Sequence, residues 1–392
     1  MSTALIRPDA VLGDALDDAL DDLGTELFAT LRRSDQRRRG MEYIHGLLST
    51  RGRKSIRNMA ALKGSSTGQS LHHFICSSTW DWIPVRRSLA GYLTRLAPPQ
   101  AYVARLMTIP KVGRHSVGVS RYFSVDEGQA LNAQRAVGVW GVTGTIAAPF
   151  SWRLYLPQTW IKDGLRRNQA SIPCEVGPET LGDCVLTACR ESLTAWELPA
   201  QPVVVDIEEA DPAATVRGLR AMGFPAMVRV HGDLPLTVHD PALTGHGAHL
   251  LTAPEIMQAA RSLFRPMARL QTVSRSLPAV RRTALVAAVG VRVPGAGSGG
   301  APLSLVGVNA PGRRGPAEMW LTDLPHPAAA VLRFGDAARR VERDFDEVTC
   351  QVGIRDYVGR SYGGWHRHTT LASAAHAVAV LSSAAPQARQ AS

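Results

Sequence analysis

Residues 202–230 constrain the fold more than any other part of the sequence. A compact apolar segment over 202–205 ends at Asp206, and a second apolar segment covers 226–230. Between them, residues 213–222 have the spacing typical of a helix. A strand, a helix and a second strand in this order, preceded by further strands, predict a mixed α/β sheet.

Segments with strand or helix character flank this unit on both sides. We expect strands over residues 102–109, 115–123, 136–146, 152–156, 283–293, 303–308 and 317–321. We expect helices over residues 178–196, 253–263, 328–348 and 370–383. The predicted division is an all-helical N-terminal module over 1–98, a sheet domain over 99–232 and 301–383, an insertion with strands of its own over 233–300, and a polar disordered tail over 384–392.

The sign of the charge reverses within the N-terminal module. Residues 9–26 carry seven acidic side chains and no basic one, with leucines at helical spacing. Residues 32–57 carry nine basic side chains against Asp35 and Glu42. In a chain with a formal net charge of +11, such clustering is the footprint expected of contacts to nucleic-acid phosphates. The alternative is a solvated helix face whose arginines pair with the acidic helix.

Cysteine usage and hydropathy exclude several classes of protein. The five cysteines are widely spaced and contain no Cys-x-x-Cys pair, which argues against a disulfide scaffold or a zinc ribbon. No apolar run approaches the ~18 residues of a membrane-spanning helix, and the N-terminus lacks the order of a signal peptide. We therefore expect a cytoplasmic protein that does not contact a membrane.

Carboxylates gather directly after the apolar segment that ends at Asp206. Glu208, Glu209 and Asp211 follow within five residues. Open α/β sheets bind ligands at the carboxyl ends of their strands, and carboxylate oxygens suit Mg²⁺. Asp211 precedes Pro212, a pattern typical of a helix N-cap, so we assign Asp211 to capping. Asp206 is the stronger candidate for chemistry.

A series of short blocks in fixed order resembles a known family. The blocks include Arg-Arg-Ser-Asp-Gln-Arg-Arg-Arg (32–39), Tyr-Ile-His-Gly-Leu-Leu (43–48), Trp-Asp-Trp (80–82), Gly-Arg-His-Ser-Val-Gly-Val-Ser-Arg-Tyr-Phe-Ser (113–124), Trp-Arg-Leu-Tyr-Leu-Pro (152–157), Trp-Leu-Thr-Asp (320–323) and Val-Gly-Arg-Ser-Tyr-Gly-Gly-Trp-His-Arg-His (358–368). Their order resembles that of DDE-type insertion-sequence transposases from about residue 25 to 383. The resemblance implies an α/β fold in which a ribonuclease H-like mixed sheet is interrupted by a β-containing insertion.

In that family three acids hold two Mg²⁺ ions, which activate water and stabilise the leaving 3′ oxygen during strand cleavage. The resemblance assigns the three acid positions to residues 105, 206 and 351, which in this sequence are Arg105, Asp206 and Gln351. No Asp or Glu occurs between Leu96 and Ser124, so no shift in alignment restores the first acid. A guanidinium ~4 Å from a metal ion is repelled by several kcal/mol at an effective dielectric of about 20. We therefore expect no metal cofactor, and we expect Arg105 to form an ion pair with Asp206.

Other carboxylates lie near the position of the third acid. Glu342, Asp344, Asp346 and Glu347 lie in the same predicted helix that precedes Gln351. One of these carboxylates in the place of the third acid would rescue a site for Mg²⁺. An active transposase with a substituted metal site therefore stays an alternative.

Charge and resemblance together select the side chains expected to contact DNA. They are Arg32, Arg33, Arg37, Arg38, Arg39, Arg53, Lys54, Arg57, Lys111, Arg114, Arg121, Arg360, His366 and Arg367. A metal pair of His366 and His368 lacks a third ligand, and a Cys350–His115 nucleophile rests on no evidence of proximity.

These observations favour a catalytically defective, transposase-like protein that binds double-stranded DNA, such as a domesticated regulatory protein. A different class of function is an enzyme site for a small-molecule ligand, built in the old groove from Arg105, Asp206, Glu208 or Cys350. The sequence is compatible with a homo-oligomer but does not specify one.

Overall fold

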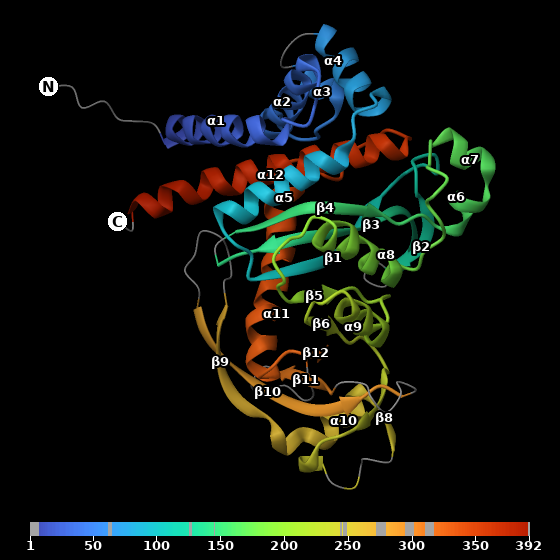
Figure 1. The fold of residues 1–392 in the computed structure, drawn as a ribbon, viewed down its shortest axis with the longest axis vertical. Coiled ribbons are helices and arrows are strands. Elements are labelled where there is room, and N and C mark those ends of the chain that lie inside the picture. The colour runs from blue at the N-terminus through green and yellow to red at the C-terminus, as the bar shows by residue number, and fades with distance from the viewer. Residues whose placement is uncertain are drawn as a thin grey trace, which may run out of the picture.

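The computed structural model describes residues 8–61, 65–124, 128–144, 146–243, 245, 249–271, 280–294, 302–309 and 317–390. One mixed sheet carries helices on both faces, and a layer of N-terminal helices lies above it (Figure 1). The N-terminal elements are α1 (Pro8–Leu27), α2 (Ser34–Ser49), α3 (Ile56–Ala61), α4 (Ser65–His72), η1 (His73–Ser77) and α5 (Trp82–Leu96). Every described element up to Leu96 is thus helical.

The remaining elements follow the predicted alternation of strands and helices. The strands are β1 (Ala101–Pro110), β2 (Ser120–Ser124), β3 (Gln129–Val142), β4 (Ala147–Leu154), β5 (Val203–Asp206), β6 (Ala226–Arg229), β7 (Pro235–Val238), β8 (Leu250–Thr252), β9 (Arg265–Gln271), β10 (Val280–Arg292), β11 (Leu303–Asn309) and β12 (Glu318–Thr322). The helices are α6 (Gln158–Lys162), α7 (Gly164–Gln169), α8 (Leu181–Cys189), η2 (Arg190–Thr194), α9 (Pro212–Ala221), η3 (Pro241–Leu243), α10 (Ala253–Ala259), η4 (Ala260–Leu263), α11 (Pro327–Asp344), η5 (Phe345–Thr349) and α12 (Tyr362–Gln390).

The strand order confirms the predicted sheet type. The order is β2-β3-β1-β5-β6-β12-β11-β10-β7-β8, with β4 paired to β3 and β9 paired to β10. Strand β3 is antiparallel to both β1 and β4, whereas β5 and β6 run parallel to β1. Three antiparallel strands followed by two parallel ones form the ribonuclease H-like core. The insertion strands extend this same sheet through β10, β11 and β12 instead of forming a separate one.

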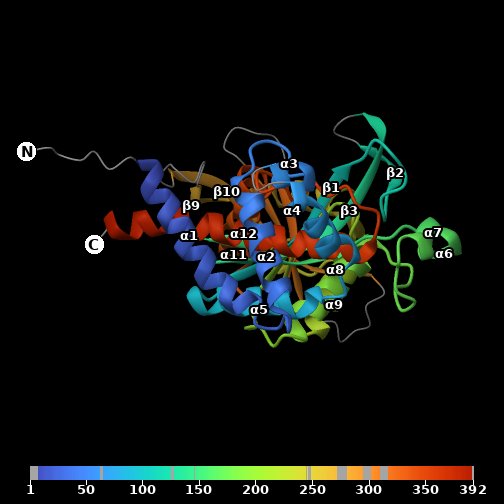
Figure 2. The ribbon, with the colours of Figure 1, turned by 90° about the horizontal axis from the view of Figure 1, so that it is seen from above.

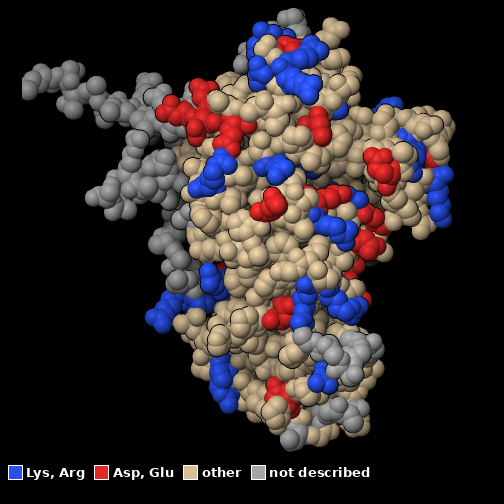
Figure 3. Space-filling view, viewed as in Figure 1, with Lys and Arg blue, Asp and Glu red and all other residues tan. Residues whose placement is uncertain are grey.

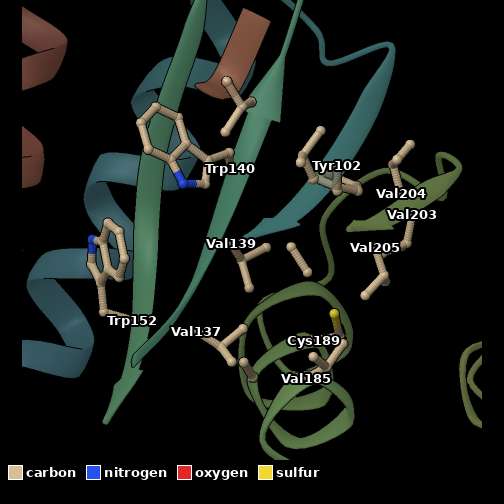
Figure 4. Packing of buried hydrophobic residues seen from close by; sticks show 14 of the residues in the cluster. Tyr102, Val137, Val139, Trp140, Trp152, Val185, Cys189, Val203, Val204 and Val205 are labelled. Carbon is tan, nitrogen blue, oxygen red and sulfur yellow. The ribbon is translucent and has the colours of Figure 1, made fainter. Parts of the chain in front are cut away.

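Side chains on both faces of the sheet contribute to the hydrophobic core, because successive residues of a strand point to opposite faces. Val137 and Val139 of β3 point toward Val185 and Cys189 of α8, whereas Trp140 points to the opposite face (Figure 4). There Trp140 meets the ring of Phe345 edge-on, at a centroid distance of 6.3 Å. Because neighbouring strand residues face opposite sides, the apolar β3 segment is covered by helices on both faces.

Three boundaries differ from the sequence-based expectation. The strand expected over 115–123 begins only at Ser120, because the chain turns before it and Gly118 adopts a φ of +76°. The helix expected over 370–383 begins at Tyr362, since the Gly363-Gly364 pair hides its start from propensity arguments. The same helix reaches Gln390, so the tail expected to be disordered over 384–392 is helical through 390.

Helix α12 is buried although it is rich in polar residues. It packs against α1, α2, η1 and α5 on one side and β4 on the other, below the N-terminal helices (Figure 2). The Trp152 indole donates to Ser373 Oγ at 2.9 Å, and His376 Nε2 lies 2.8 Å from the Ala147 carbonyl oxygen. Hydrogen bonds thus offset the cost of burying these polar groups. The N-terminal helices share one core with the sheet.

The buried Arg86 of α5 crosses this interface. Its Nε donates to Thr370 Oγ1 at 2.7 Å and its Nη1 to the Trp152 carbonyl oxygen at 2.6 Å. Its Nη2 lies within hydrogen-bonding distance of Thr369 Oγ1 and of the carbonyl oxygen of His366.

Within the described residues, no helix combines the length and apolarity needed to cross a membrane.

We predict that acid destabilises this interface through His368. Its Nδ1 lies 2.8 Å from the Tyr43 hydroxyl and its Nε2 3.0 Å from the Gly353 carbonyl oxygen. Burial lowers the pKa of His368 to about 4 from 6.5, so the unfolded chain binds a proton first as the pH falls. The contribution of the neutral, buried His368 to the free energy of unfolding is therefore fully present above pH ~6.5. About 3 kcal/mol of it is lost as the pH falls from ~6.5 to ~4.

Thermal unfolding of the native chain and of His368→Gln across that pH range measures this effect. The melting temperature of the variant should depend less steeply on pH, while His249→Gln, at an exposed position, should retain the native dependence. Equal slopes for the native chain and His368→Gln would contradict the assignment.

Candidate functional site

The parallel pairing of β1 and β5 places Arg105 directly beside Asp206. Residues paired in register on neighbouring strands project to the same face of a sheet. Both side chains line a cavity of about 240 Å³ at the carboxyl end of β5, together with Glu208, His231 and Glu342. We call this the strand-end cavity. Asp206 therefore lies where sequence reasoning placed it, with Arg105 as its neighbour.

Asp206 is held by two basic side chains from the next strand. Arg229 Nη1 donates to Asp206 Oδ2 at 2.9 Å, and His231 Nε2 lies 3.3 Å from Asp206 Oδ1. Burial alone would raise the pKa of Asp206, but the hydrogen bond from His231 and the charge of Arg229 outweigh it and lower the pKa. Both carboxylate oxygens are therefore already occupied by donors.

The expected ion pair between Arg105 and Asp206 is absent, which corrects that prediction. The Arg105 guanidinium instead lies over the Phe345 ring, 4.1 Å from its centroid. Burial lowers the pKa of Arg105, while the nearby charges of Asp346 and Glu342 oppose that shift. The attraction of the aromatic face and of two carboxylates turns Arg105 toward α11 and η5, and this leaves Asp206 to Arg229.

The third predicted position also needs correction. Gln351 is exposed on the turn that follows η5 and does not line the strand-end cavity. Glu342, one of the four alternatives from the same helix, does line it. Helix α11 packs across β1 and β5, so Glu342, two residues before its end, faces the strand ends, whereas Gln351 lies beyond the helix.

These groups do not fit a pair of divalent ions. Within the described part of the chain, no three His, Cys, Asp or Glu side chains come close enough together to hold a metal. The cavity presents the cation Arg105 where the resemblance requires an acid, and Asp206 already accepts from Arg229. Hard divalent cations need several free oxygen ligands, and the side chains of the strand-end cavity do not provide them.

Basic side chains lead from the cavity toward the N-terminal module. Arg355 lies over the same Phe345 ring, at 4.8 Å from its centroid. Lys111 Nζ donates to the Tyr357 carbonyl oxygen at 2.7 Å. Burial and then the charge of Arg53 lower the pKa of Lys111 to about 8, which shows that Arg53 is close. We call Arg53, Lys111, Arg105 and Arg355 the basic rim.

Most of the side chains expected to contact DNA are accessible. The exposed members are Arg32, Arg33, Arg37, Arg38, Arg53, Arg57, Arg114, Arg121 and Arg360, and Arg39 and Lys111 are half-buried. Glu26 of α1 pairs with Arg95 of α5, whereas Arg33 pairs with Asp35 and Arg39 with Glu42. The described acids of α1 thus do not neutralise the arginines of α2. Figure 3 shows basic side chains gathered over the N-terminal helices.

Three predicted DNA contacts are wrong because the side chains are buried. Lys54 Nζ donates to the Thr50 carbonyl oxygen. Arg367 is buried under Trp80, to whose carbonyl oxygen its Nε donates at 3.0 Å. His366 stacks on Trp82 at a centroid distance of 4.9 Å, and burial holds its pKa well below 6.5. Tertiary packing makes His366 and Arg367 ties between α12 and the N-terminal helices, whereas the Lys54 side chain bonds within its own segment.

The remaining weaker candidates have structural surroundings. His368 bonds to Tyr43 and to backbone carbonyl oxygens, which leaves it no metal-binding role with His366. Burial raises the pKa of Cys350, and His115 is exposed on the turn before β2. A thiol with a raised pKa is a poor nucleophile. As assigned from sequence, Asp211 caps α9 by accepting from the Ala214 amide at 2.8 Å.

A comparison with known protein families identifies the family to which this chain belongs. Residues 26–285 match the family described as DDE superfamily endonuclease, which is about two thirds of the chain and includes Arg105 and Asp206. The chain belongs to this family. The match confirms that this DDE superfamily member is transposase-like and has a ribonuclease H-like fold. No curated protein sequence matches it significantly.

Sequence reasoning missed Arg229, His231 and Arg355. The first two could have been found, because the register Val205↔Val228, continued by one residue, sets Arg229 beside Asp206. Arg355 follows a turn at Gly353, and only the folded position of Phe345 brings it to the cavity. No pattern in the sequence distinguishes it from other arginines.

We predict that Asp206 acts as a structural anion. Asp206→Ala leaves Arg229 and His231 without their carboxylate and should lower the free energy of unfolding by about 1 kcal/mol, since the pair is partly exposed. Urea unfolding with and without Mg²⁺ measures this. If Mg²⁺ stabilises the native chain and Asp206→Ala abolishes that effect, the carboxylate binds metal and the assignment fails.

Proposed function

We propose that this DDE superfamily chain binds double-stranded DNA but neither cleaves nor joins strands, as a domesticated, regulatory derivative of a transposase. The observation that carries the proposal is the position of Arg105, which β1 places in register with Asp206. In the family these two strand positions hold acids that share metal ions. Here the first of them is a cation.

Electrostatics around Asp206 supports the loss of cleavage. Arg229 and His231 together occupy the carboxylate that would have to ligate a metal. An incoming divalent ion would have to displace Arg229 and would face the charge of Arg105 at the same time. At an effective dielectric of about 20, each unit-charge pair ~4 Å apart is worth about 4 kcal/mol, so both terms oppose binding.

The exposed basic residues support retained DNA binding. Arg53 and Arg57 are both exposed and follow α2 in the chain, and α12 packs against α2. Arginines fixed on a rigid surface neutralise phosphates without a large ordering cost. Site recognition can therefore persist after metal chemistry is lost.

A substituted metal site is the alternative that a specific observation favours. Glu342 lines the strand-end cavity with Asp206 and Glu208, although among the described residues no three such groups are close enough together to hold a metal without rearrangement. The cavity, at about 240 Å³, admits a phosphate group or a small ligand but not a duplex. The alternative therefore predicts nicking that depends on Glu342.

The DNA-binding part of the proposal is tested by the salt dependence of duplex binding. The log–log plot of affinity against salt should be steep for the native chain, and its slope should fall by up to about two in the double variant Arg53→Gln, Arg57→Gln, one for each lost phosphate contact. Mobility-shift titrations at several salt concentrations measure this slope.

Arg217→Gln provides the matched control, since Arg217 is exposed on α9, outside the predicted interface. It should leave the slope unchanged. Absence of duplex binding, or equal slopes for the native chain and the double variant, rejects the predicted interface.

The loss of cleavage is tested separately with supercoiled plasmid. Incubation with Mg²⁺ or Mn²⁺ should produce no nicked circles from the native chain, whether or not DNA binding is observed. Metal-dependent nicking that Glu342→Gln abolishes would establish the substituted metal site and overturn this part of the proposal.

A further inference from the structure

A second, larger cavity lies on the other side of α11. Its volume is about 660 Å³, and it is bounded by α11, β9, the start of β1 and the end of β3. Figure 1 shows α11 and β9 side by side at this position, and the two elements are in contact. None of its described lining residues lines the strand-end cavity. We call it the arginine cleft.

Basic side chains dominate the arginine cleft. Among the described residues that line it, Asp336 is the one acid, and five are arginines: Arg269, Arg333, Arg339, Arg340 and Arg343. All but Arg269 belong to α11, where intervals of three or four residues bring side chains to neighbouring positions on one face. The cleft therefore concentrates positive charge in a concave space, where its field is strongest.

Ion pairs and backbone contacts hold several of these arginines in place. Arg339 Nη2 donates to Asp336 Oδ1 at 2.6 Å, and its Nη1 donates to Glu318 Oε1 at 2.9 Å. Arg340 Nη1 donates to the carbonyl oxygens of Thr143 and Gly144, at 2.7 and 2.6 Å. Side chains anchored in this way lose little conformational entropy when they bind a ligand.

The arginines repel one another across the cleft. Arg269 lies 3.7 Å from Asp336, yet it shares that carboxylate with Arg339. Burial and then the charge of Arg339 lower the pKa of Arg269. Glu318 pairs with Arg339 as well, at 2.9 Å. A bound anion would relieve this repulsion.

An apolar wall completes the cleft. Val142, Met267, Leu332 and Phe334 line it beside the arginines. The exposed Arg333 lies over the Phe334 ring, 5.2 Å from its centroid. Small-molecule sites typically occupy ~300–1,000 Å³ and combine apolar walls with a few fixed polar groups, and the arginine cleft has these properties.

We propose that the arginine cleft binds a nucleotide, with its phosphates held by the α11 arginines and its base against the apolar wall. Arginine forks match the geometry of phosphate oxygens, and guanidinium planes also stack on aromatic rings and bases. This site is separate from the strand-end cavity and from the basic rim. The inference does not rest on the proposed loss of cleavage.

Isothermal titration of the full chain with ATP in the presence of EDTA tests the proposal. Binding should saturate at one ATP per chain, and Arg333→Gln should weaken it about tenfold, as expected for loss of one charged contact. Arg333 is exposed and stacks only on Phe334 among its described contacts, so this substitution should leave folding intact. Arg340→Gln is the second variant, with thermal unfolding as the check that it is folded.

Arg217→Gln is the matched control, because it removes an exposed arginine of α9 that does not line the arginine cleft, and it should not change ATP affinity. No saturable binding, or equal affinity for the native chain and Arg333→Gln, overturns the proposal. Inorganic tripolyphosphate binding as tightly as ATP would show that the apolar wall is not used and would also overturn it. Displacement of ATP by a DNA duplex, with the same sensitivity to Arg333→Gln, would assign the cleft to the DNA backbone instead.

Discussion

The buried guanidinium of Arg86 is the interaction on which the arrangement of the molecule depends. Only 2% of Arg86 is exposed, and its direct partners on β4 and α12 are uncharged. A buried cation without an acidic partner is stable only where its N–H groups are hydrogen-bonded. Helices α5 and α12 and strand β4 are therefore held in one arrangement, and the arginines of the N-terminal helices are fixed relative to the sheet.

Parallel strand pairing imposes the second constraint. The register of β1 with β5 sets residue 105 beside residue 206, whatever the two side chains are. Residue 105 is a cation in this chain, and its pairing with residue 206 is regular all the same. The fold preserves the geometry of the site, while its chemistry is decided by a few side chains.

Helix α11 divides two cavities of different character. Its Glu342 faces the strand ends, where acids and bases are balanced, and its Arg340 faces a cleft rich in arginine. Because residues two positions apart on a helix point in nearly opposite directions, one helix serves both surfaces. The exposed N-terminal arginines form a further basic surface.

The amino-acid sequence by itself determined the element types, the mixed sheet and the strand-end position of Asp206, because periodicity and residue identity are local properties. It also identified the exposed arginines of α2. Only the tertiary structure decided that His366 and Arg367 are buried ties, that Arg105 turns to Phe345, and that Glu342, not Gln351, reaches the strand ends. Burial and side-chain partners depend on contacts between residues hundreds of positions apart, and local patterns do not encode those distances.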